Sequence, residues 1–370
     1  MPVRIGVEEE FHIVDLSTGM PVSAASGLLE RLPDRTFVRE LQQSVVETNS
    51  RVHDTLDSLR TDLASTRLLL AETAAPLGLG VMAAGAPPQT RTGTLDATPT
   101  SRYARMMEEY AAVADEQLIC AAQVHVDVPD RDTGVQAMAR LAPWVPVLLA
   151  LSASSPFWLG ADTGYASWRN LVMQRWPTSG PPGAYASAAE YEAMVDELIQ
   201  AKVIADSGMV YFDLRLSAHQ DTLELRVCDA CPRVDTVVMI AGLFRAMVVD
   251  ACEAVRDGGT APGESAAPTV QAVRPEWLRA ATWRAARSGL RGDLLNPVDR
   301  RAAPAAQVVR TLLERFRGAL EAAGDWATVA DLVDRELAGG GAAHRLRAVA
   351  DDTGLDDVVD LLVAETQGAR

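Results

Sequence analysis

Apolar residues recur with two different spacings along this chain, and each spacing predicts its own kind of secondary structure. Leucines return every three or four positions within 54–75, which is the period of an amphipathic helix. The same period continues through almost all of the chain after Pro304. The other predicted helices cover residues 102–118, 135–152, 188–205, 234–255 and 275–287.

Alternation of apolar and polar residues predicts strands between these helices. The last two are separated only by residues 218–221, a gap that fits an antiparallel hairpin. Helices and strands do not alternate regularly, which argues against a Rossmann-type parallel sheet. We therefore predict one α+β domain over residues 1–370, with a largely antiparallel sheet backed by helices and a mainly helical C-terminal part from about residue 304. The predicted strands cover residues 3–15, 36–41, 45–51, 80–84, 122–128, 209–217 and 222–228.

Charged side chains repeat on one face of several predicted strands. Residues i and i+2 of a strand point to the same side, so Glu8 lies with Glu10, and Glu224 with Arg226. A solvated sheet face explains each strand taken alone. Neighbouring carboxylates repel one another, however, unless a cation neutralises them, and Mg²⁺ prefers oxygen ligands. The positions expected on this face are Gly6, Glu8, Glu10 and His12, then Gln123, His125 and Asp127, then Met209, Tyr211, Asp213, Arg215 and Ser217, and finally Thr222, Glu224, Arg226 and Cys228.

Two features do not fit a sheet with one apolar and one polar face. Glu9 falls on the apolar side of the first strand, where an edge position or a buried ion pair would account for it. Cys228 and Cys231 form a lone C-x-x-C. A zinc site would need a second pair of ligands, and a redox centre would need a low-pKa thiol at a helix start. We favour two reduced cysteines that close a strand.

Composition narrows the classes of function. The formal net charge is −16, from 34 Lys+Arg against 50 Asp+Glu, which disfavours binding to nucleic acid or to anionic membranes. The sequence has no apolar stretch of membrane-spanning length and no signal pattern at its start, so we expect a cytoplasmic protein with four reduced cysteines. Lys202 is the only lysine, which excludes a P-loop and leaves phosphate chemistry to arginines and metal ions.

Five motifs, in the same order, resemble those of the carboxylate–amine ligases related to type 2 glutamate–cysteine ligase. Residues 6–11 read G-V-E-E-E-F, similar to the G-x-E-x-E strand of that family. Each motif is weak alone, but together they run from about Val3 to at least Gly292. The others are Q-V-H-V-D at 123–127, R-L-S-A-H-Q-D-T-L-E-L-R-V-C-D at 215–229, W-R-A-A-R-S-G-L at 283–290, and the acidic pair Glu40 and Glu47, seven residues apart.

The resemblance implies a fold similar to the catalytic domain of glutamine synthetase, with an antiparallel sheet curved into a funnel and backed by helices. It also implies that ATP phosphorylates a substrate carboxylate, and that an amine then attacks the acyl phosphate to form an amide. The expected reaction is glutamate–cysteine ligation, with ATP and Mg²⁺ as cofactors and small amino acids as substrates. Two alternatives stay open: a ligase for another carboxylate and amine in specialised metabolism, and a nucleotide-binding regulator without turnover. A homodimer also stays open, because the sequence carries no interface signature.

The resemblance further implies roles for particular residues. Arg226 would neutralise the transferring phosphoryl group, and Glu40 would position the amine. Arg215 and Arg287 would bind phosphate or the substrate carboxylate, because a guanidinium fork matches both. Arg226, Arg215 and His125 would contact the nucleotide, Asp213 would support the site from behind, and Arg169 is either a family position or a surface-loop arginine. The implied magnesium ligands are Glu8, Glu10, Glu47, His125 and Glu224.

Two departures from the family pattern concern the substrate. The segment Gly85-Ala86-Pro87-Pro88 stands where relatives often carry a Gly-Thr-His-Pro-like turn, and Ala281 stands where they often carry asparagine. Both changes bear on the identity of the substrate more than on the ATP chemistry.

Overall fold

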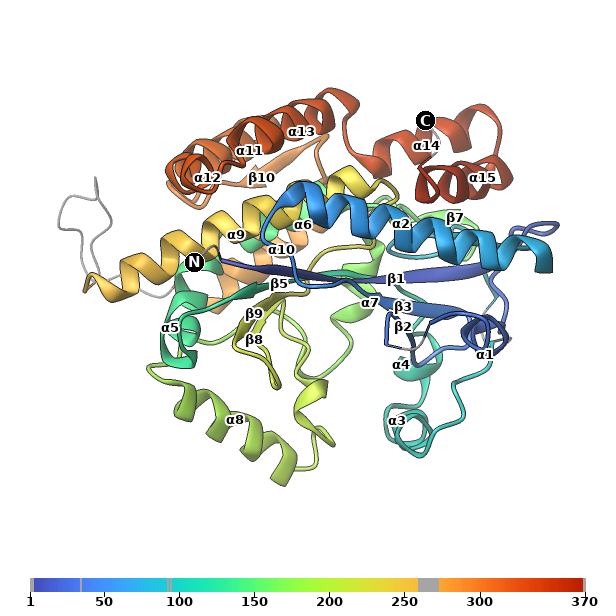
Figure 1. Ribbon diagram of the computed structural model, residues 1–370, viewed down its shortest axis with the longest axis horizontal. Helices are drawn as coiled ribbons and strands as arrows, with labels where there is room; N and C mark the ends of the chain where they lie inside the picture. The colour runs from blue at the N-terminus through green and yellow to red at the C-terminus, as the bar shows by residue number, and fades with distance from the viewer. Residues whose placement is uncertain (1–2, 34, 92, 94, 259–272, 369–370) are drawn as a thin grey trace.

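The computed structural model describes residues 3–33, 35–91, 93, 95–258 and 273–368 (Figure 1). Within these residues, seven strands form an antiparallel sheet in the order β2–β3–β1–β5–β9–β8, and β4 pairs with the second half of β1. The predicted antiparallel sheet is therefore confirmed. Its strands are β1 (Ile5–Asp15), β2 (Phe37–Arg39), β3 (Val45–Asn49), β4 (Leu79–Met82), β5 (Ala122–Asp127), β8 (Leu214–Leu216) and β9 (Thr222–Leu225); the short pairs are β6 (Phe157–Trp158) with β7 (Ala161–Asp162), and β10 (Asp293–Leu295) with β11 (Ala302–Pro304).

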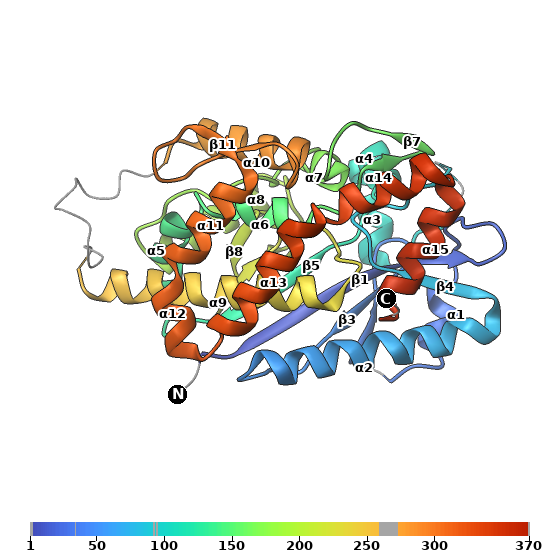
Figure 2. The ribbon, with the colours of Figure 1, turned by 90° about the horizontal axis from the view of Figure 1, so that it is seen from above.

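Helices cover one face of the sheet. The long helices α2 (Leu56–Ala74) and α9 (Val234–Arg256) lie along it (Figures 1 and 2). The other helices are α1 (Ala25–Leu29), α3 (Ser101–Tyr110), α4 (Ala112–Asp115), α5 (Arg131–Leu141), α6 (Val145–Ser152), α7 (Trp168–Met173), α8 (Ala188–Gln200), α10 (Pro275–Ser288), α11 (Ala305–Arg315), α12 (Arg317–Ala323), α13 (Trp326–Gly339), α14 (Ala342–Asp352) and α15 (Leu355–Thr366), with 3₁₀ turns at Ala75–Leu77 and Ser207–Met209. Because α9 contacts α2, α5, α6, α12 and α13, it is buried around most of its circumference. Of the C-terminal helices, α12 and α13 pack on α9, whereas α15 packs on β4.

Two predicted helices are broken in the structure. The stretch 102–118 divides at Ala111, whose positive φ of 46° cannot continue a helix. The stretch 135–152 divides after Leu141, because Pro143 lacks the N–H that the next helical hydrogen bond requires. Both breaks correct the prediction of single helices. The Pro, Gly and Ser content of residues 257–271 predicts a loop, but most of this stretch lies outside the described residues.

Glu9 is part of a buried ion pair, the second of its two proposed explanations. Arg67 on α2 donates from Nη2 to Glu9 Oε1 at 2.5 Å, and the two side chains are 1% and 2% exposed. The same guanidinium donates to the carbonyls of Pro232 and Cys231 at 2.7 and 2.8 Å. A charged residue therefore ties β1, α2 and the start of α9 together on the apolar side of the sheet.

The hairpin between β8 and β9 is shorter than predicted, because a bulge ends its ladder. The carbonyl of Asp213 accepts from the backbone N–H groups of both Arg226 and Val227, at 2.9 and 3.2 Å. Two residues thus oppose one, and a bulge of this kind changes the side to which following side chains point. Alternation predicted that Cys228 lies on the polar face, and this is wrong. The residue is buried, with its Sγ toward the carbonyl of Leu148 on α6.

Among the described helices, none is by itself both long and apolar enough to cross a membrane. The pair α5 and α6 passes such a test only when taken together, and it is bent by 72° at the break. Both helices pack against α9.

Candidate functional site

The acidic residues of neighbouring strands lie side by side on the sheet face opposite α2 and α9. Antiparallel register places Glu10 of β1 opposite Glu47 of β3, and His125 of β5 opposite Glu224 of β9. Since Glu8 is two residues from Glu10, it faces the same side. The predicted shared face therefore forms across four adjacent strands.

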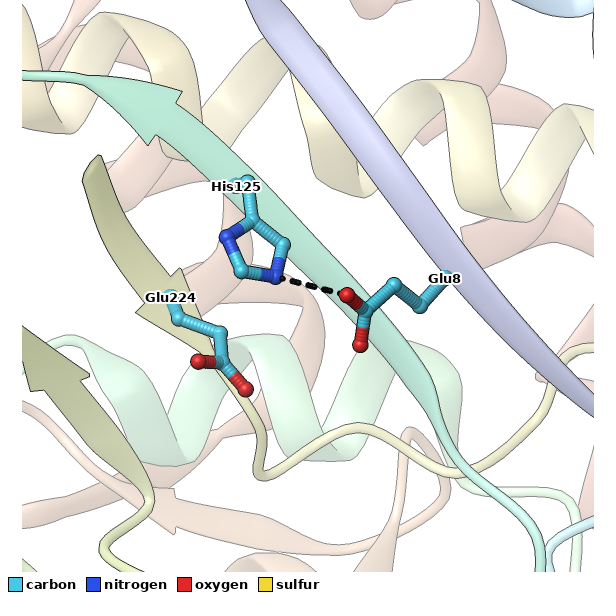
Figure 3. Close-up of side chains that lie close together, drawn as sticks. All are labelled: Glu8, His125 and Glu224. Carbon is cyan, nitrogen blue, oxygen red and sulfur yellow. Dashed lines mark ion pairs between the residues drawn. The ribbon is translucent and has the colours of Figure 1, made fainter. Parts of the chain in front are cut away.

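The first cluster contains Glu8, His125 and Glu224, whose ligand atoms lie within 4.8 Å of one another (Figure 3). His125 Nε2 is 3.3 Å from Glu8 Oε1, an ion-pair distance, but the direction is not that of a hydrogen bond. The other ring nitrogen, Nδ1, lies 3.0 Å from Thr222 Oγ1. Burial disfavours the charged imidazole, yet Glu8 and Glu224 outweigh it and raise the pKa of His125. This cluster thus presents two carboxylates and a buried ring nitrogen without a hydrogen-bond partner among the described residues.

The second cluster contains Glu10, Glu40 and Glu47, whose ligand oxygens also lie within 4.8 Å of one another. Burial and the charge of Glu40 raise the pKa of Glu10 to about 8, although the N–H of Ala121 donates to it at 2.7 Å. Burial and the charges of its neighbours raise the pKa of Glu47 well above its usual range. Such crowding of carboxylates is costly unless a cation joins them, and both clusters offer the oxygen-rich donor set that Mg²⁺ prefers.

Two arginines neutralise Glu224. Arg215 donates from Nε to Glu224 Oε2 at 2.7 Å, and Arg226 donates to the other oxygen and to Gln123 Oε1. Burial alone would raise the pKa of Glu224, but the charges of Arg226, Arg215 and His125 lower it to about 2. Glu224 is therefore ionised throughout the neutral range and is already matched by positive charge.

A pocket opens over the second cluster and beside Glu8 of the first. It brings together six of the residues that were assigned a role, Arg169, and others that the sequence patterns did not indicate. Among the newly found residues, Trp176 packs edge-on against Tyr211 at 5.3 Å and donates from Nε1 to Gln117 Oε1 at 2.7 Å. Arg102 and Tyr103 come from α3. These residues lie on short helices and loops, which carry no alternation signal. The pocket is lined by Glu8, Glu10, Glu40, Leu41, Glu47, Arg102, Tyr103, Met106, Gln117, Ile119, Ala121, Gln123, Arg169, Met173, Trp176, Gly208, Tyr211, Arg215 and Arg226.

Arg169 belongs to this pocket, so its interpretation as a surface-loop arginine is wrong. Its side chain comes from α7, and the residue is only 5% exposed. It donates from Nη1 to the carbonyl of Val227 at 3.1 Å and from Nη2 to that of Arg226 at 3.2 Å. Arg169 and Arg226 therefore lie next to each other in the pocket wall.

Several predicted residues lie outside the pocket lining, among them His125 and Glu224 of the first cluster. Arg287 is exposed on α10, where it donates to the carbonyl of Gly164 and stacks over Tyr165 at 5.5 Å. The structure does not bring it to the two clusters. Asp213 is buried behind the pocket, and burial raises its pKa to about 7 against the opposing charge of Arg169. His12 shares the polar face but is enclosed, and burial lowers its pKa to about 3.

The C-x-x-C pair has the properties of core residues. Cys228 and Cys231 are both free and fully buried. Burial raises the pKa of Cys228 to about 12 and that of Cys231 well above its usual range. Since a redox centre needs an accessible thiolate, the geometry disfavours that role.

Comparisons of the sequence identify one family. The model for glutamate-cysteine ligase family 2 (GCS2) matches residues 4–361. The chain is 52% identical over 366 residues to a protein named "Putative glutamate--cysteine ligase 2-2" from Frankia casuarinae, covering 99% of this chain and 42% of that protein. It is 51% identical over 367 residues to a protein of the same name from Mycolicibacterium smegmatis, covering 99% and 90%. The chain thus spans less than half of the first relative and most of the second.

Solved structures show the same fold at low sequence identity. A glutamate–cysteine ligase from Francisella tularensis in complex with AMP matches with a TM-score of 0.74 and 12% identity, covering 100% of this chain and 89% of that one. A bifunctional glutathione synthetase from Pasteurella multocida matches with a TM-score of 0.70 and 14% identity, covering 99% and 52%. These likenesses support the predicted fold and add nothing by themselves about substrates.

Proposed function

The chain belongs to glutamate–cysteine ligase family 2, and on that premise we propose that it is an ATP-dependent carboxylate–amine ligase. The observation that carries the proposal is the pocket itself, where Glu8 of the first cluster and all three carboxylates of the second lie with four arginines. Opposite charges of this density suit a polyphosphate bridged to carboxylates by divalent cations. A regulatory protein without turnover would not need both clusters intact.

The proposed reaction has two steps. A carboxylate oxygen of the first substrate attacks the γ-phosphorus of ATP, and the bond to ADP breaks. The amine of the second substrate then attacks the acyl carbon, inorganic phosphate leaves, and the amine nitrogen loses a proton. Both steps move negative charge between oxygens, so positioning and charge neutralisation supply most of the catalysis.

The arginines of the pocket are suited to the moving charge. Arg226 is fixed by Glu224 and Gln123 and stacks over Tyr211 at 5.9 Å. A guanidinium held in this way can meet phosphoryl oxygens without reorganising, which is worth more than a mobile charge. We assign Arg226 to the phosphoryl group, and Arg215 to phosphate or to a substrate carboxylate.

The donor chemistry of both clusters fits Mg²⁺. We propose that Glu8, His125 and Glu224 form one binding set, and that Glu10, Glu40 and Glu47 form another. Bound magnesium would neutralise phosphate oxygens and orient them. Glu40 was expected to position the amine, but its place beside Glu10 and Glu47 favours the cation-binding role. Arg287 keeps no role in this proposal.

We propose glutamate as the carboxylate donor and cysteine as the acceptor amine, by analogy with the names of the relatives. The turn at Gly85-Ala86-Pro87-Pro88 and the presence of Ala281 favour keeping another amine as the second candidate. The four buried free cysteines are consistent with the cytoplasmic location that we propose. A homodimer remains a question for measurement of mass in solution.

The test is phosphate release with Mg-ATP, first with single amino acids and then with pairs. Release that requires glutamate and cysteine together, with the dipeptide as product, would establish the leading assignment. Release with glutamate and a different amine would retain the ligase chemistry and replace the acceptor. Tight ATP binding without release on any pair would reject the ligase in favour of a regulator.

A further inference from the structure

Asp229 buries a carboxylate directly behind the pocket wall. The residue is 0% exposed and does not line the cavity, so no substrate can reach it. Three donors hold it: the N–H of Ser154 at 3.0 Å and the hydroxyl of Ser155 at 2.7 Å reach Oδ2, and the hydroxyl of Ser167 reaches Oδ1 at 2.7 Å. A buried carboxylate with this many donors is held in one orientation.

The two hydroxyls that bind Asp229 also hold the helix that carries Arg169. Ser167 is the N-cap of α7, and its Oγ accepts from the N–H of Asn170 at 3.2 Å. Ser155 Oγ accepts from the N–H of Arg169 itself at 3.1 Å. Because α7 has only six residues, it is too short to be stable by itself, and such contacts determine its direction.

Arg169 closes the ring of contacts from the other side. Its guanidinium donates to the carbonyls of Arg226 and Val227, in the segment that leads directly to Asp229. The carboxylate of Asp229 thus holds the backbone at the start of α7 through two serine hydroxyls. In return, the Arg169 side chain of α7 holds the backbone just before Asp229. The separation between the two pocket arginines is fixed by this ring.

The surrounding atoms leave Asp229 little room to move. A Cβ atom on Gly85 would lie 2.5 Å from Asp229 Cγ, so this glycine is what admits the carboxylate. Burial raises the pKa of Asp229, whereas the charge of Arg169 and the three donors favour the ionised form. Arg169, which the Asp229 carboxylate positions, therefore also stabilises the ionised form of that carboxylate.

We propose that Asp229 is a positioning residue, which orients α7 so that Arg169 and Arg226 present their guanidinium groups to one anionic group of the substrate. The proposal rests on the ligase function proposed above. Asp229 does not touch the reacting atoms, so its whole effect on turnover passes through Arg169.

Three buried hydroxyl groups provide a matched first test, measured well below the melting temperature of each variant. Ser155→Ala and Ser167→Ala each remove one hydroxyl from the Asp229 carboxylate, and we expect each to lower kcat/KM at least 10-fold. Thr133→Ala is the control, because it removes a buried hydroxyl from the Asp130 carboxylate at the start of α5, outside the pocket lining, and we expect less than a 2-fold change. Equal losses in all three variants, in proportion to their stability, would overturn the proposal.

A double-mutant cycle gives the decisive measurement, because a merely structural residue would add its effect to that of Arg169. We expect Asp229→Asn to lower kcat about 100-fold, since a displacement of about 1 Å can cost that much. In an Arg169→Gln background, the same change should cause less than a 3-fold further loss. Full additivity of the two losses would refute the positioning role.

A crystal structure of the Ser155→Ala, Ser167→Ala double variant separates this inference from the proposed function. Displacement of the Arg169 guanidinium from the two carbonyls supports the inference even if the wild-type protein releases no phosphate with any pair. An unmoved guanidinium contradicts it even if the wild-type protein is an active ligase. If the wild-type protein releases no phosphate, this result by itself counts against the proposed ligase reaction and not against the positioning role of Asp229.

Discussion

At the scale of single residues, the negative charge of Glu224 is matched by arginines that bind it in a defined geometry. Glu224 is 1% exposed, and both of its oxygens are bound by guanidinium groups. Arg226 donates from Nη1 to both Glu224 and Gln123. These two contacts hold the guanidinium in place, so the direction of its remaining N–H groups is also fixed. A planar guanidinium can therefore bind Glu224 and present further donors in a fixed direction at the same time, which an ammonium group cannot do.

Arg226→Lys therefore tests shape at constant charge. We expect kcat for phosphate release to fall by about 10²–10³, because an ammonium group cannot hold Glu224 and meet phosphoryl oxygens at once. Arg310→Lys is the control, since Arg310 pairs with Asp334 where both side chains are exposed, and its activity should be unchanged. Wild-type turnover by Arg226→Lys would remove this arginine from the phosphoryl site.

A second residue-scale prediction concerns stability in acid. Burial alone would raise the pKa of Asp62, but hydrogen bonds from His53 and from Arg51 hold it below its usual value. A carboxylate whose folded pKa is depressed stabilises the protein above its unfolded pKa of about 3.9, and this contribution is lost as the pH falls through the folded value. Asp62→Asn should thus be less stable than wild type at pH 7, with a difference that shrinks toward pH 2.5. Urea unfolding across this range measures it; a constant difference would contradict the linkage.

At the scale of elements, close packing of helices depends on one glycine. Gly242 lies in the middle of α9, where a Cβ atom would meet Val329 on α13 at 2.6 Å and Leu56 on α2 at 2.9 Å. Three helices therefore approach one another at this point because no side chain separates them. The period of apolar residues predicts α9 but does not reveal this approach.

Gly242→Ala should destabilise the protein by about 1–3 kcal/mol through overpacking, although glycine to alanine in a helix normally stabilises it by up to about 1 kcal/mol. Gly318→Ala in α12 is the matched control, because a Cβ atom there meets nothing within 4 Å, and it should stabilise slightly. Denaturant unfolding measures the change in the free energy of unfolding, which should be a loss for Gly242→Ala and a small gain for Gly318→Ala. Stabilisation by Gly242→Ala would mean that the three helices can separate at little cost.

At the scale of the whole molecule, the C-terminal helices pack against the sheet and the core helices. α15 packs on β4, and Leu362 joins Val14 and Met82 in one buried apolar cluster. Arg233, next to the start of α9, pairs with Glu365 on α15. These contacts support the prediction that the helical part after residue 304 belongs to the same domain as the sheet.

If the chain is one cooperative domain, Leu362→Ala should lower the free energy of global unfolding by about 2–5 kcal/mol. The transitions followed by circular dichroism and by tryptophan fluorescence should still coincide. Leu159→Ala is the control, since this leucine is 46% exposed and should have little effect. A separate early transition in Leu362→Ala would instead indicate a C-terminal part that unfolds independently.

The sequence by itself determined most of the secondary structure and the side of most strand positions that carry charge. Glu8 and Glu10 share a face because successive residues of a strand alternate, whatever the strand pairs with. The paired spacing of carboxylates and arginines, together with the family motifs, also sufficed to predict six residues that line the pocket. Such local patterns fail where a proline, a left-handed residue or a bulge interrupts the period, as at Ala111 and Cys228.

Only the tertiary structure decided which of these residues act together. Strand order and register divide the carboxylates into two clusters and place Glu40 in the second. The same long-range contacts bring Arg169 to the pocket and leave Arg287 on the surface, although the sequence assigned a role to Arg287 and left that of Arg169 open. Trp176 comes from a segment without a periodic pattern, and the helical period over 102–118 does not show that Arg102 faces the pocket. The physical reason is that pairing between distant segments depends on the packing of the whole chain, which no local spacing encodes.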